Sequence, residues 1–417
     1  MRVLITSFGT RGDIQPYVAL AASLRGAGHE VTLAVPEAFR ALARSAVADA
    51  GFVPAGSALL NLVQDEMPTM RGPRGTVRLL GRMRSAMRRH MVDQWRAARS
   101  AEPDLIVYHP KTLAAPHIAE RLGVPGVLSL PIPLMTPTGQ FPAPFGLGRT
   151  LGTRLNRASY LFRYAGNAMY GRMINEFRHR IGLRSASWFA DPLRAPDGAP
   201  VPVLYPFSRH VAPVPADYPP SVHVTGYWFL PHDDGWRPAP LLADFLAAGE
   251  RPVYVGFGSM GFGMGADERR DAVLSALRTN RLRGVVATGW GGLTAGDAPS
   301  DDVLVVDEVP HDWLFPRVRA VVHHGGAGST GAGLRAGRPT LICPFLADQP
   351  FWGLRVHEIG AGPPPLSSWR LGAGLAERLG RLVGEPSYRR RAAEIGERIR
   401  AEDGTAEAVC VLESIGS

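Results

Sequence analysis

The segment VVHHGGAGSTGAG, residues 321–333, combines two histidines with a run of glycines and other small residues. The apolar residues before His323 predict a strand, and the residues after Gly326 predict the first turn of a helix. Small residues let backbone N–H groups approach a ligand closely, and a helix N-terminus adds positive potential. We predict that this turn binds a diphosphate group; tight backbone packing is the alternative explanation.

The paired histidines could be taken for metal ligands, but their positions on a strand argue against a shared metal ion. Adjacent residues of a strand point to opposite faces of the sheet, so His323 and His324 are not expected to share one ion. We expect His323 to pack inward and His324 to donate a hydrogen bond to the ligand. No Asp-x-Asp motif occurs in the second half of the chain, so no metal site is predicted.

A second glycine-rich turn follows the strand-like run PVYVGFGSM. Residues 256–261, GFGSMG, satisfy the G-x-G-x-x-G pattern of dinucleotide-binding proteins. Such a site also needs an acidic residue near the end of the next strand, and VVATGWG supplies none. We therefore reject an NAD site and assign Ser259 to phosphate binding.

Composition narrows the classes of protein. The 417 residues carry a net charge of +9, and Lys111 is the single lysine. The arginines are spread along the chain without a basic tail or an RNA-binding signature, which argues against nucleic acid and favours small phosphorylated ligands. The chain lacks a tract of about 18 apolar residues and an export segment, so a cytoplasmic location is expected. Cys343 and Cys410 are both expected to be buried thiols.

Strand-like and helix-like segments alternate along both halves of the chain, which predicts parallel sheets wrapped by helices. The fold class is α/β, with two doubly wound, Rossmann-like domains that face an interdomain cleft. The predicted units are an N-terminal domain at 1–225, a linker at 226–240, a C-terminal domain at 241–395, and a helical segment at 396–417 that packs back toward the N-terminal domain. The linker is rich in Pro, Gly and Asp.

Residues 71–99 are strongly basic and carry Met83, Met87, Met91 and Trp95 at four-residue spacing. This pattern predicts an amphipathic helix whose stripe meets the core while the arginines face water. Two alternatives stay open: the stripe lines an adaptable acceptor pocket, because Met repacks easily around irregular ligands, or the basic face contacts a membrane.

Four segments together resemble the GT-B glycosyltransferases that transfer sugars from nucleotide sugars to lipophilic small molecules. These are SFGTRGDIQPYVALA, GFGSM, HHGGAGSTGAGLRAGRPT and PFLADQPFWGLRV, in the order and spacing of the family. The resemblance extends over the whole chain and includes sterol glucosyltransferases and bacterial natural-product glycosyltransferases. It implies an enzyme that uses UDP- or dTDP-sugar as co-substrate and needs no cofactor.

The resemblance also assigns residues to the donor. His324 and Ser259 would hold the diphosphate, Asp348 and Gln349 the sugar hydroxyls, and Val309 and Trp290 would border the base. The remaining predicted donor contacts are Arg11, Gly12, Gly326, Ala327, Gly328 and Ser329. Plant relatives bind the ribose with a Glu where this chain has Ala332.

On the acceptor side, plant relatives use a histidine base oriented by an aspartate. Here Asp13, in GTRGDIQP, takes the place of the histidine, and His109, in DLIVYHPKT, aligns with the aspartate. The resemblance therefore suggests an exchanged pair, with a burial-raised pKa suiting Asp13 to its role as base. The alternatives are that Asp13 N-caps a helix beginning at Ile14, and that His109 is an ordinary buried histidine.

We expect an inverting, metal-independent transfer of a hexose or deoxyhexose to a hydroxyl of a polyketide, terpenoid or sterol-like acceptor. The Pro-rich segment 131–145, with Pro131 and Phe141, and the methionines Met83 and Met87 are assigned to acceptor binding. No nucleic-acid partner is expected; peripheral membrane contact and a monomer or homodimer stay open. The rival hypotheses are a nucleotide-sugar epimerase and a noncatalytic partner protein of the same fold.

Overall fold

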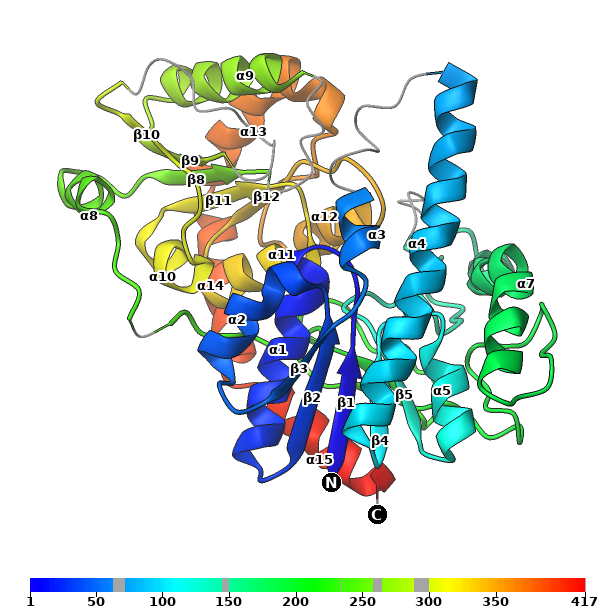
Figure 1. Ribbon diagram of the computed structural model, residues 1–417. Coiled ribbons are helices and arrows are strands. Elements are labelled where there is room, and N and C mark those ends of the chain that lie inside the picture. The colour runs from blue at the N-terminus through cyan, green and yellow to red at the C-terminus, as the bar shows by residue number, and fades with distance from the viewer. Residues whose placement is uncertain (63–71, 145–149, 234, 258–264, 289–299, 417) are drawn as a thin grey trace.

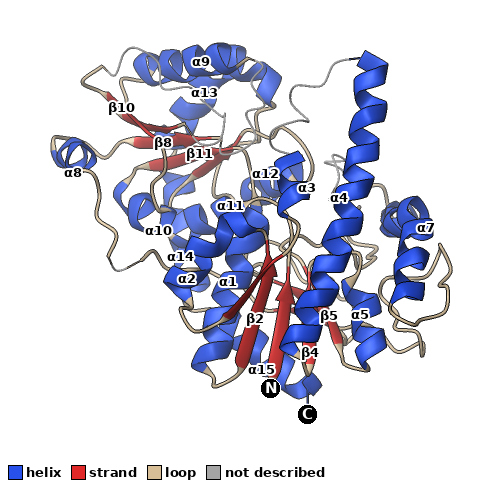
Figure 2. Ribbon diagram, in the orientation of Figure 1, coloured by secondary structure: helices blue, strands red, loops and turns tan. Residues whose placement is uncertain are grey.

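The computed structural model describes residues 1–62, 72–144, 150–233, 235–257, 265–288 and 300–416. Within it the chain forms two domains, each a parallel sheet with helices on both faces (Figures 1 and 2). The predicted α/β fold with two doubly wound domains is confirmed.

The N-terminal domain contains a seven-stranded sheet in which every neighbouring pair is parallel. Its order is β3-β2-β1-β4-β5-β6-β7, so β1 lies between strands that come later in the chain on both sides. The strands are β1 (Arg2–Thr6), β2 (Glu30–Val35), β3 (Gly51–Pro54), β4 (Leu105–Tyr108), β5 (Gly126–Ser129), β6 (Val203–Tyr205) and β7 (Val222–Val224). Central strands are buried on both faces, which explains why β1 and β4 read as unbroken apolar runs.

Several helices of this domain pack on its sheet, whereas others lie beyond the strand ends or to the side (Figure 2). They are α1 (Arg11–Gly26), α2 (Arg40–Ala46), α3 (Ser57–Asn61), α4 (Gly72–Ala101), α5 (Ala115–Leu122), α6 (Thr153–Ser159) and α7 (Ala165–Arg180), with 3-10 turns at Glu37–Phe39 and Tyr160–Tyr164. Between β5 and α6, the described residues 130–144 form no helix or strand, as the proline-rich sequence predicted.

The C-terminal domain repeats the plan with five parallel strands in the order β10-β9-β8-β11-β12. Its strands are β8 (Val253–Gly256), β9 (Gly284–Ala287), β10 (Val303–Val306), β11 (Ala320–His323) and β12 (Thr340–Ile342). Its helices are α8 (Pro240–Ala247), α9 (Ala266–Thr279), α10 (His311–Leu314), α11 (Ala327–Arg335), α12 (Gln349–Glu358), α13 (Leu371–Gly384) and α14 (Pro386–Arg400), with 3-10 turns at Phe315–Arg317 and Ser368–Arg370.

The chain crosses between the domains a second time after α14. The last helix, α15 (Gly404–Gly416), packs on α1 and adds Ala408, Val409, Val411 and Leu412 to the core around β1 and α1. In Figure 1 this helix, drawn in red, lies beneath the N-terminal domain. The predicted boundary at residue 396 falls inside α14, so the return crossing itself begins after Arg400.

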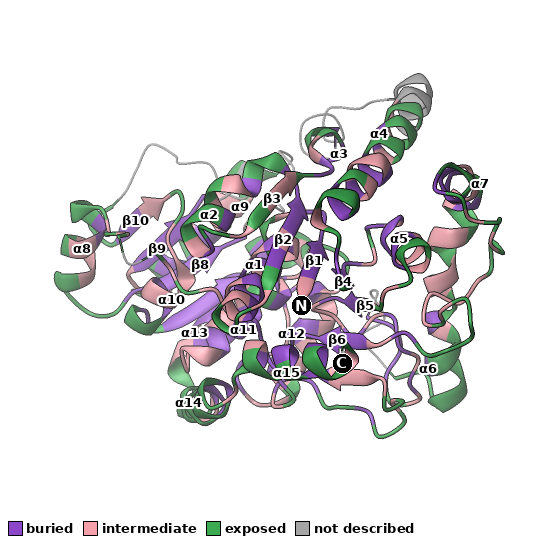
Figure 3. Cartoon of the chain, turned by 60° about the horizontal axis from the view of Figure 1, so that its bottom comes forward, coloured by how far each residue is buried: buried purple, intermediate pink, exposed green. Residues whose placement is uncertain are grey.

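The two domains share one apolar core cluster. It joins Phe207 of the N-terminal domain to Trp352 on α12, whose ring centroids are 6.0 Å apart. Figure 3 shows the buried strands of both sheets and the more exposed outer faces of the helices. The domains are therefore packed against each other and not only tethered by the linker.

Each sheet has a switch point. From this point, the chain adds successive strands toward one edge of the sheet on one side and toward the other edge on the other side. The switch points lie between β1 and β4 in one sheet and between β8 and β11 in the other. In open α/β sheets, ligands bind outside the carboxyl ends of the strands at such points. The candidate site is therefore expected at the ends of these four strands.

The methionine stripe of α4 agrees mainly with the core interpretation. Met91 is buried, and Met87 and Trp95 pack partly buried against the core, whereas Met83 is half-buried near the other end of the stripe. None of the helices described here is both long and apolar enough to cross a membrane.

One prediction about the cysteines is wrong. Cys343 is fully buried, as expected, but Cys410 is exposed. Cys410 lies on α15, where its neighbours Val409, Val411 and Leu412 face the core in its place.

Candidate active site

Asp13 lies in the first turn of α1, directly after the loop that leaves β1. Its Oδ2 accepts a hydrogen bond from the backbone N–H of Thr10 at 2.9 Å, so the carboxylate closes the turn that begins the helix. The helix begins at Arg11, with Thr10 as its N-cap. The prediction that Asp13 is the N-cap of a helix beginning at Ile14 is therefore wrong, because Asp13 takes the third helical position.

His109 follows β4 and is brought to Asp13 by the pairing of β1 with β4. Its Nε2 lies 3.6 Å from Asp13 Oδ1, and its Nδ1 accepts the backbone N–H of Lys111 at 3.1 Å. Burial, assisted by the charge of Lys111, lowers the pKa of His109 to about 3. His109 is therefore neutral at pH 7, and because Nδ1 is an acceptor, Nε2 carries the proton toward Asp13.

Lys111 is a partner of Asp13 that the sequence analysis did not predict. Its ammonium lies 2.8 Å from Asp13 Oδ1. Burial acts to raise the pKa of Asp13, but the charge and hydrogen bond of Lys111, with the Thr10 N–H, outweigh burial and hold that pKa below its usual value. The expected rise in the pKa of Asp13 is wrong. The sequence feature that could have pointed to this contact is that the one lysine of the chain lies two residues after His109.

The paired histidines end β11 and lead into α11. His323 is fully buried, and its Nδ1 accepts the backbone N–H of Gly325 at 2.9 Å. His324 is less buried; burial lowers its pKa to about 4, and its Nδ1 has no hydrogen-bond partner among the described residues. Both histidines are neutral at pH 7, and the structure places His323 in the core and His324 next to the turn.

Glycines are needed where this turn meets its neighbours. Gly325 has φ +99°, and a Cβ there would lie 2.6 Å from Cγ2 of Ile342. A Cβ at Gly326 would lie 2.7 Å from Nε2 of His324, so the imidazole rests against this glycine. Gly326 is the N-cap of α11, Ala327 is buried, and Gly328 faces open space with Ser329 beside it.

Asp348 and Gln349 lie at the start of α12. Oδ2 of Asp348 accepts the indole N–H of Trp352 at 2.8 Å, and burial raises the pKa of Asp348 to about 6. Charge interactions with Asp13 and Lys111 also act on Asp348, so the start of α12 lies within electrostatic reach of the loops that follow β1 and β4. Gln349 is buried, and its Oε1 accepts the N–H groups of Phe345 and Leu346.

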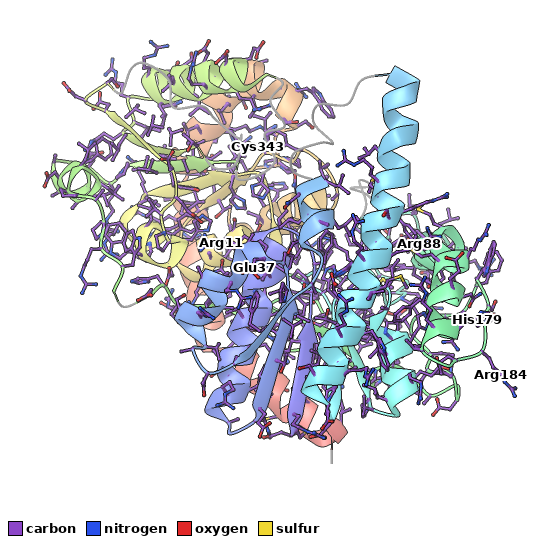
Figure 4. The ribbon with its side chains drawn as sticks, viewed as in Figure 1. Arg11, Glu37, Arg88, His179, Arg184 and Cys343 are labelled. Carbon is purple, nitrogen blue, oxygen red and sulfur yellow. The ribbon has the colours of Figure 1, made fainter. Side chains whose placement is uncertain are left out.

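Arg11 reaches across the interdomain boundary from the first turn of α1. It forms an ion pair with Glu308, which follows β10. Figure 4 shows Arg11 where the two domains meet. Burial lowers the pKa of His311 to about 4, and the charge of Arg11 adds to this effect. The guanidinium therefore lies on the side of the cleft to which donor contacts were assigned.

The other predicted contacts are dispersed. Gly12 is exposed on α1, and Val309 is half-buried against the apolar cluster around Leu314. Phe141 is buried, with its ring centroid 5.6 Å from that of Phe351 across the domain boundary, and Pro131 is half-buried after β5. Ser259 and Trp290 lie outside the described residues.

In the described part of the chain, no group of three or more His, Cys, Asp or Glu side chains is arranged to hold a metal ion. The arrangement instead offers a carboxylate with a neutral histidine on one domain. On the other it offers a glycine-rich helix start with a neutral histidine. A carboxylate–histidine pair and a glycine-rich turn with a histidine thus end strands at the switch points of the two sheets.

Two parallel-sheet domains arranged in this way define the GT-B class of glycosyltransferases. A solved structure of the same class is the glycosyltransferase of kitacinnamycin, with a TM-score of 0.71, 19% identity, and coverage of 99% of this chain and 98% of that chain.

Sequence comparison gives the family. Residues 3–135 match the glycosyltransferase family 28 N-terminal domain, and residues 293–415 match the erythromycin biosynthesis protein CIII-like C-terminal domain. A sterol 3-beta-glucosyltransferase of Arabidopsis thaliana is 32% identical over 98% of this chain, which spans 64% of that protein. The O-mycaminosyltylonolide 6-deoxyallosyltransferase of Streptomyces fradiae is 36% identical over 99% of this chain and 96% of its own length. The chain belongs to this family of glycosyltransferases.

Proposed function

We propose that the protein transfers a sugar from a nucleoside diphosphate sugar to a hydroxyl group of a lipophilic small molecule, with inversion at the anomeric carbon and without a metal ion. One observation carries the proposal: Asp13 and His109 lie together at one switch point, and the charge of Asp13 acts on Asp348 of the other domain, whose neighbour Gln349 packs against Gly325 in the turn before α11.

Asp13 is the proton acceptor in this mechanism. His109 is unsuited to that role, because its Nδ1 is already a hydrogen-bond acceptor and burial lowers its pKa to about 3. The acceptor hydroxyl attacks the anomeric carbon from the face opposite the diphosphate. A new C–O bond forms, the bond from carbon to the phosphate oxygen breaks, and the hydroxyl proton passes to Asp13.

The leaving diphosphate gains negative charge as the bond breaks. His324, the N-terminus of α11 and Arg11 are placed to stabilise that charge with fixed hydrogen-bond donors and positive potential. Asp348 and the amide of Gln349 are the proposed partners of the sugar hydroxyls. These donors replace the divalent ion that other transferases use.

The names of the relatives support the two substrate classes. The Arabidopsis relative is named for a sterol and glucose, and the Streptomyces relative for a tylonolide and a deoxysugar. We therefore propose a UDP- or dTDP-sugar donor and a sterol-like, terpenoid or polyketide acceptor. Pro131, Phe141, Met83 and Met87 are the proposed acceptor contacts.

A thermal-shift screen with UDP, dTDP and GDP tests the donor half, since a ligand that binds only the folded chain raises its melting temperature. Release of the nucleoside diphosphate from the matching sugar donor is then measured with and without lipophilic alcohols. We expect release to depend on the alcohol. Isomerisation of the donor without an acceptor would instead support an epimerase.

Chelation tests the metal-free mechanism. Transfer should continue at an unchanged rate in excess EDTA, because protein donors stabilise the diphosphate. Activity is measured before and after dialysis against EDTA. Loss of turnover that magnesium restores would contradict this mechanism while leaving the substrate classes unchanged.

A further inference from the structure

Lys111 reaches Asp13 from the exposed side of the site. Its side chain is 49% exposed, whereas that of Asp13 is 18% exposed. The backbone of Lys111 is fixed at the same time, because its N–H donates to Nδ1 of His109. The one lysine of the chain is thus tied by its backbone to one member of the pair and by its ammonium to the other.

The two oxygens of Asp13 have different partners. Oδ2 is held by the backbone N–H of Thr10 in the first turn of α1. Oδ1 faces the ammonium of Lys111 at 2.8 Å and Nε2 of His109 at 3.6 Å. Because the helix turn engages Oδ2, an acceptor hydroxyl that donates to this carboxylate meets Oδ1 beside Lys111.

A second carboxylate faces the same lysine from the other domain. The charge of Asp13 acts to raise the pKa of Asp348, and the charge of Lys111 acts to lower it. Two facing carboxylates without a cation between them tend to share a proton and titrate as a pair. Such sharing would remove the ionised base that the proposed transfer needs.

We propose that Lys111 is a positioning residue, the shared counter-ion that keeps Asp13 ionised and oriented toward the acceptor hydroxyl while Asp348 faces it from the opposite domain. This role rests on the proposed function. The other titratable groups near Asp13 are His109 from the loop after β4 and Tyr17 from α1. Burial keeps both neutral at pH 7, so Lys111 supplies the positive charge that acts on Asp13 as well as on Asp348.

The pH dependence of kcat/KM tests the proposal through three variants. In Lys111→Met, the acid limb should move to higher pH by about one unit or more, since a nearby cation lowers a carboxyl pKa by about 1–3 units. Lys111→Arg keeps the charge and should restore much of the wild-type limb. Arg172→Met, on the exposed face of α7, removes an equal charge away from the site and should leave the limb in place. An unmoved limb in Lys111→Met would overturn the proposal.

The single lysine also permits a measurement that does not depend on activity. Lysine labelled with ¹³C and ¹⁵N gives one set of side-chain NMR signals, because position 111 is the only site. These signals should shift as Asp13 and Asp348 titrate; Asp13→Asn should abolish one inflection and Asp348→Asn the other. If the protein transfers sugar but the lysine signals titrate in the same way with and without Asp13→Asn, the role of Lys111 alone is overturned. A protein with the inflections but no transfer would overturn the proposed function.

Discussion

Asp13 serves the helix and the proposed chemistry with different atoms. The Thr10 N–H fixes Oδ2, and Oδ1 remains beside Lys111 and His109. Helix capping and proton acceptance are therefore compatible in one side chain. Capping and proton acceptance were given as alternatives in the sequence analysis, because residue type does not show that the two carboxylate oxygens of Asp13 have different partners.

Asp13→Asn should reduce transfer by roughly 10²-fold or more, because an amide cannot accept the acceptor proton. The amide oxygen can still accept the Thr10 N–H, so the start of α1 should be retained. Steady-state turnover, nucleotide affinity and melting temperature are compared with those of the wild type. Affinity for UDP or dTDP should stay within a few fold; near-normal turnover would rule out Asp13 as the base.

The two histidines of β11 should respond differently to replacement. His324→Ala should weaken binding of the nucleoside diphosphate and slow transfer, each by about 1.5–3 kcal/mol for a lost bond to a charged group. His323→Ala removes a buried ring that accepts the Gly325 N–H, so it should mainly lower the melting temperature. Calorimetry and nucleotide titration of both variants separate these effects. The reverse pattern would exchange the two assignments.

Residue type and local context were enough to single out the turn after β11, whereas Asp13 and His109 were assigned through the resemblance to the family. Lys111 was not found, because its contact with Asp13 joins positions 98 residues apart and depends on the pairing of β1 with β4. The pKa of Asp13 was misjudged for the same reason: burial alone would raise that pKa, and the opposing charge is visible only in three dimensions.

At the scale of elements, the start of α11 gives a matched comparison. Gly328 and Gly372 lie at the starts of α11 and α13. A Cβ added at either position would have no neighbouring atom of the described residues within 4 Å, other than those of its own helix backbone and chain neighbours. Alanine at either position should be tolerated or slightly stabilising, because it favours the helix by up to about 1 kcal/mol relative to glycine.

Only Gly328→Ala should weaken nucleotide binding, because the space next to α11 is where we place the diphosphate. Isothermal titration with UDP or dTDP is carried out on both variants, with Gly372→Ala as the control. Equal affinities would show that the first turn of α11 does not contact the nucleotide.

The strands that bear the site were predictable because central strands of a parallel sheet are continuous apolar runs. The edge and outer strands β3, β6 and β7 were not predicted. They have only three or four residues each and lack long apolar runs. Short strands of this kind acquire their conformation from neighbours already in the sheet, which a local pattern does not record.

At the scale of the whole molecule, buried histidines should set the response to acid. Burial lowers the pKa to about 4 for His90, His117, His311 and His324, to about 3 for His109, and well below its usual value for His323. Below pH 6.5 the unfolded chain binds protons that the folded chain does not, so the free energy of unfolding falls as pH falls.

We therefore expect full stability above about pH 6.5 and a steep loss of stability between about pH 6.5 and pH 4. Denaturant unfolding at pH 7.5, 6 and 5 measures the trend. His90→Gln should flatten the curve, since it removes one of the contributing groups. A free energy of unfolding that stays constant from pH 7.5 to pH 5 would contradict this prediction.

The packing of α15 on α1 affects the order in which the protein is completed during translation. The ribosome makes β1 and α1 long before α15, so Ala408, Val409, Val411 and Leu412, which cover them, emerge only after the strands and helices of the C-terminal domain. The N-terminal domain therefore spends most of synthesis with one apolar face open to water. Until α15 is made, the nascent chain therefore exposes apolar surface, which makes a partly synthesised chain prone to aggregate.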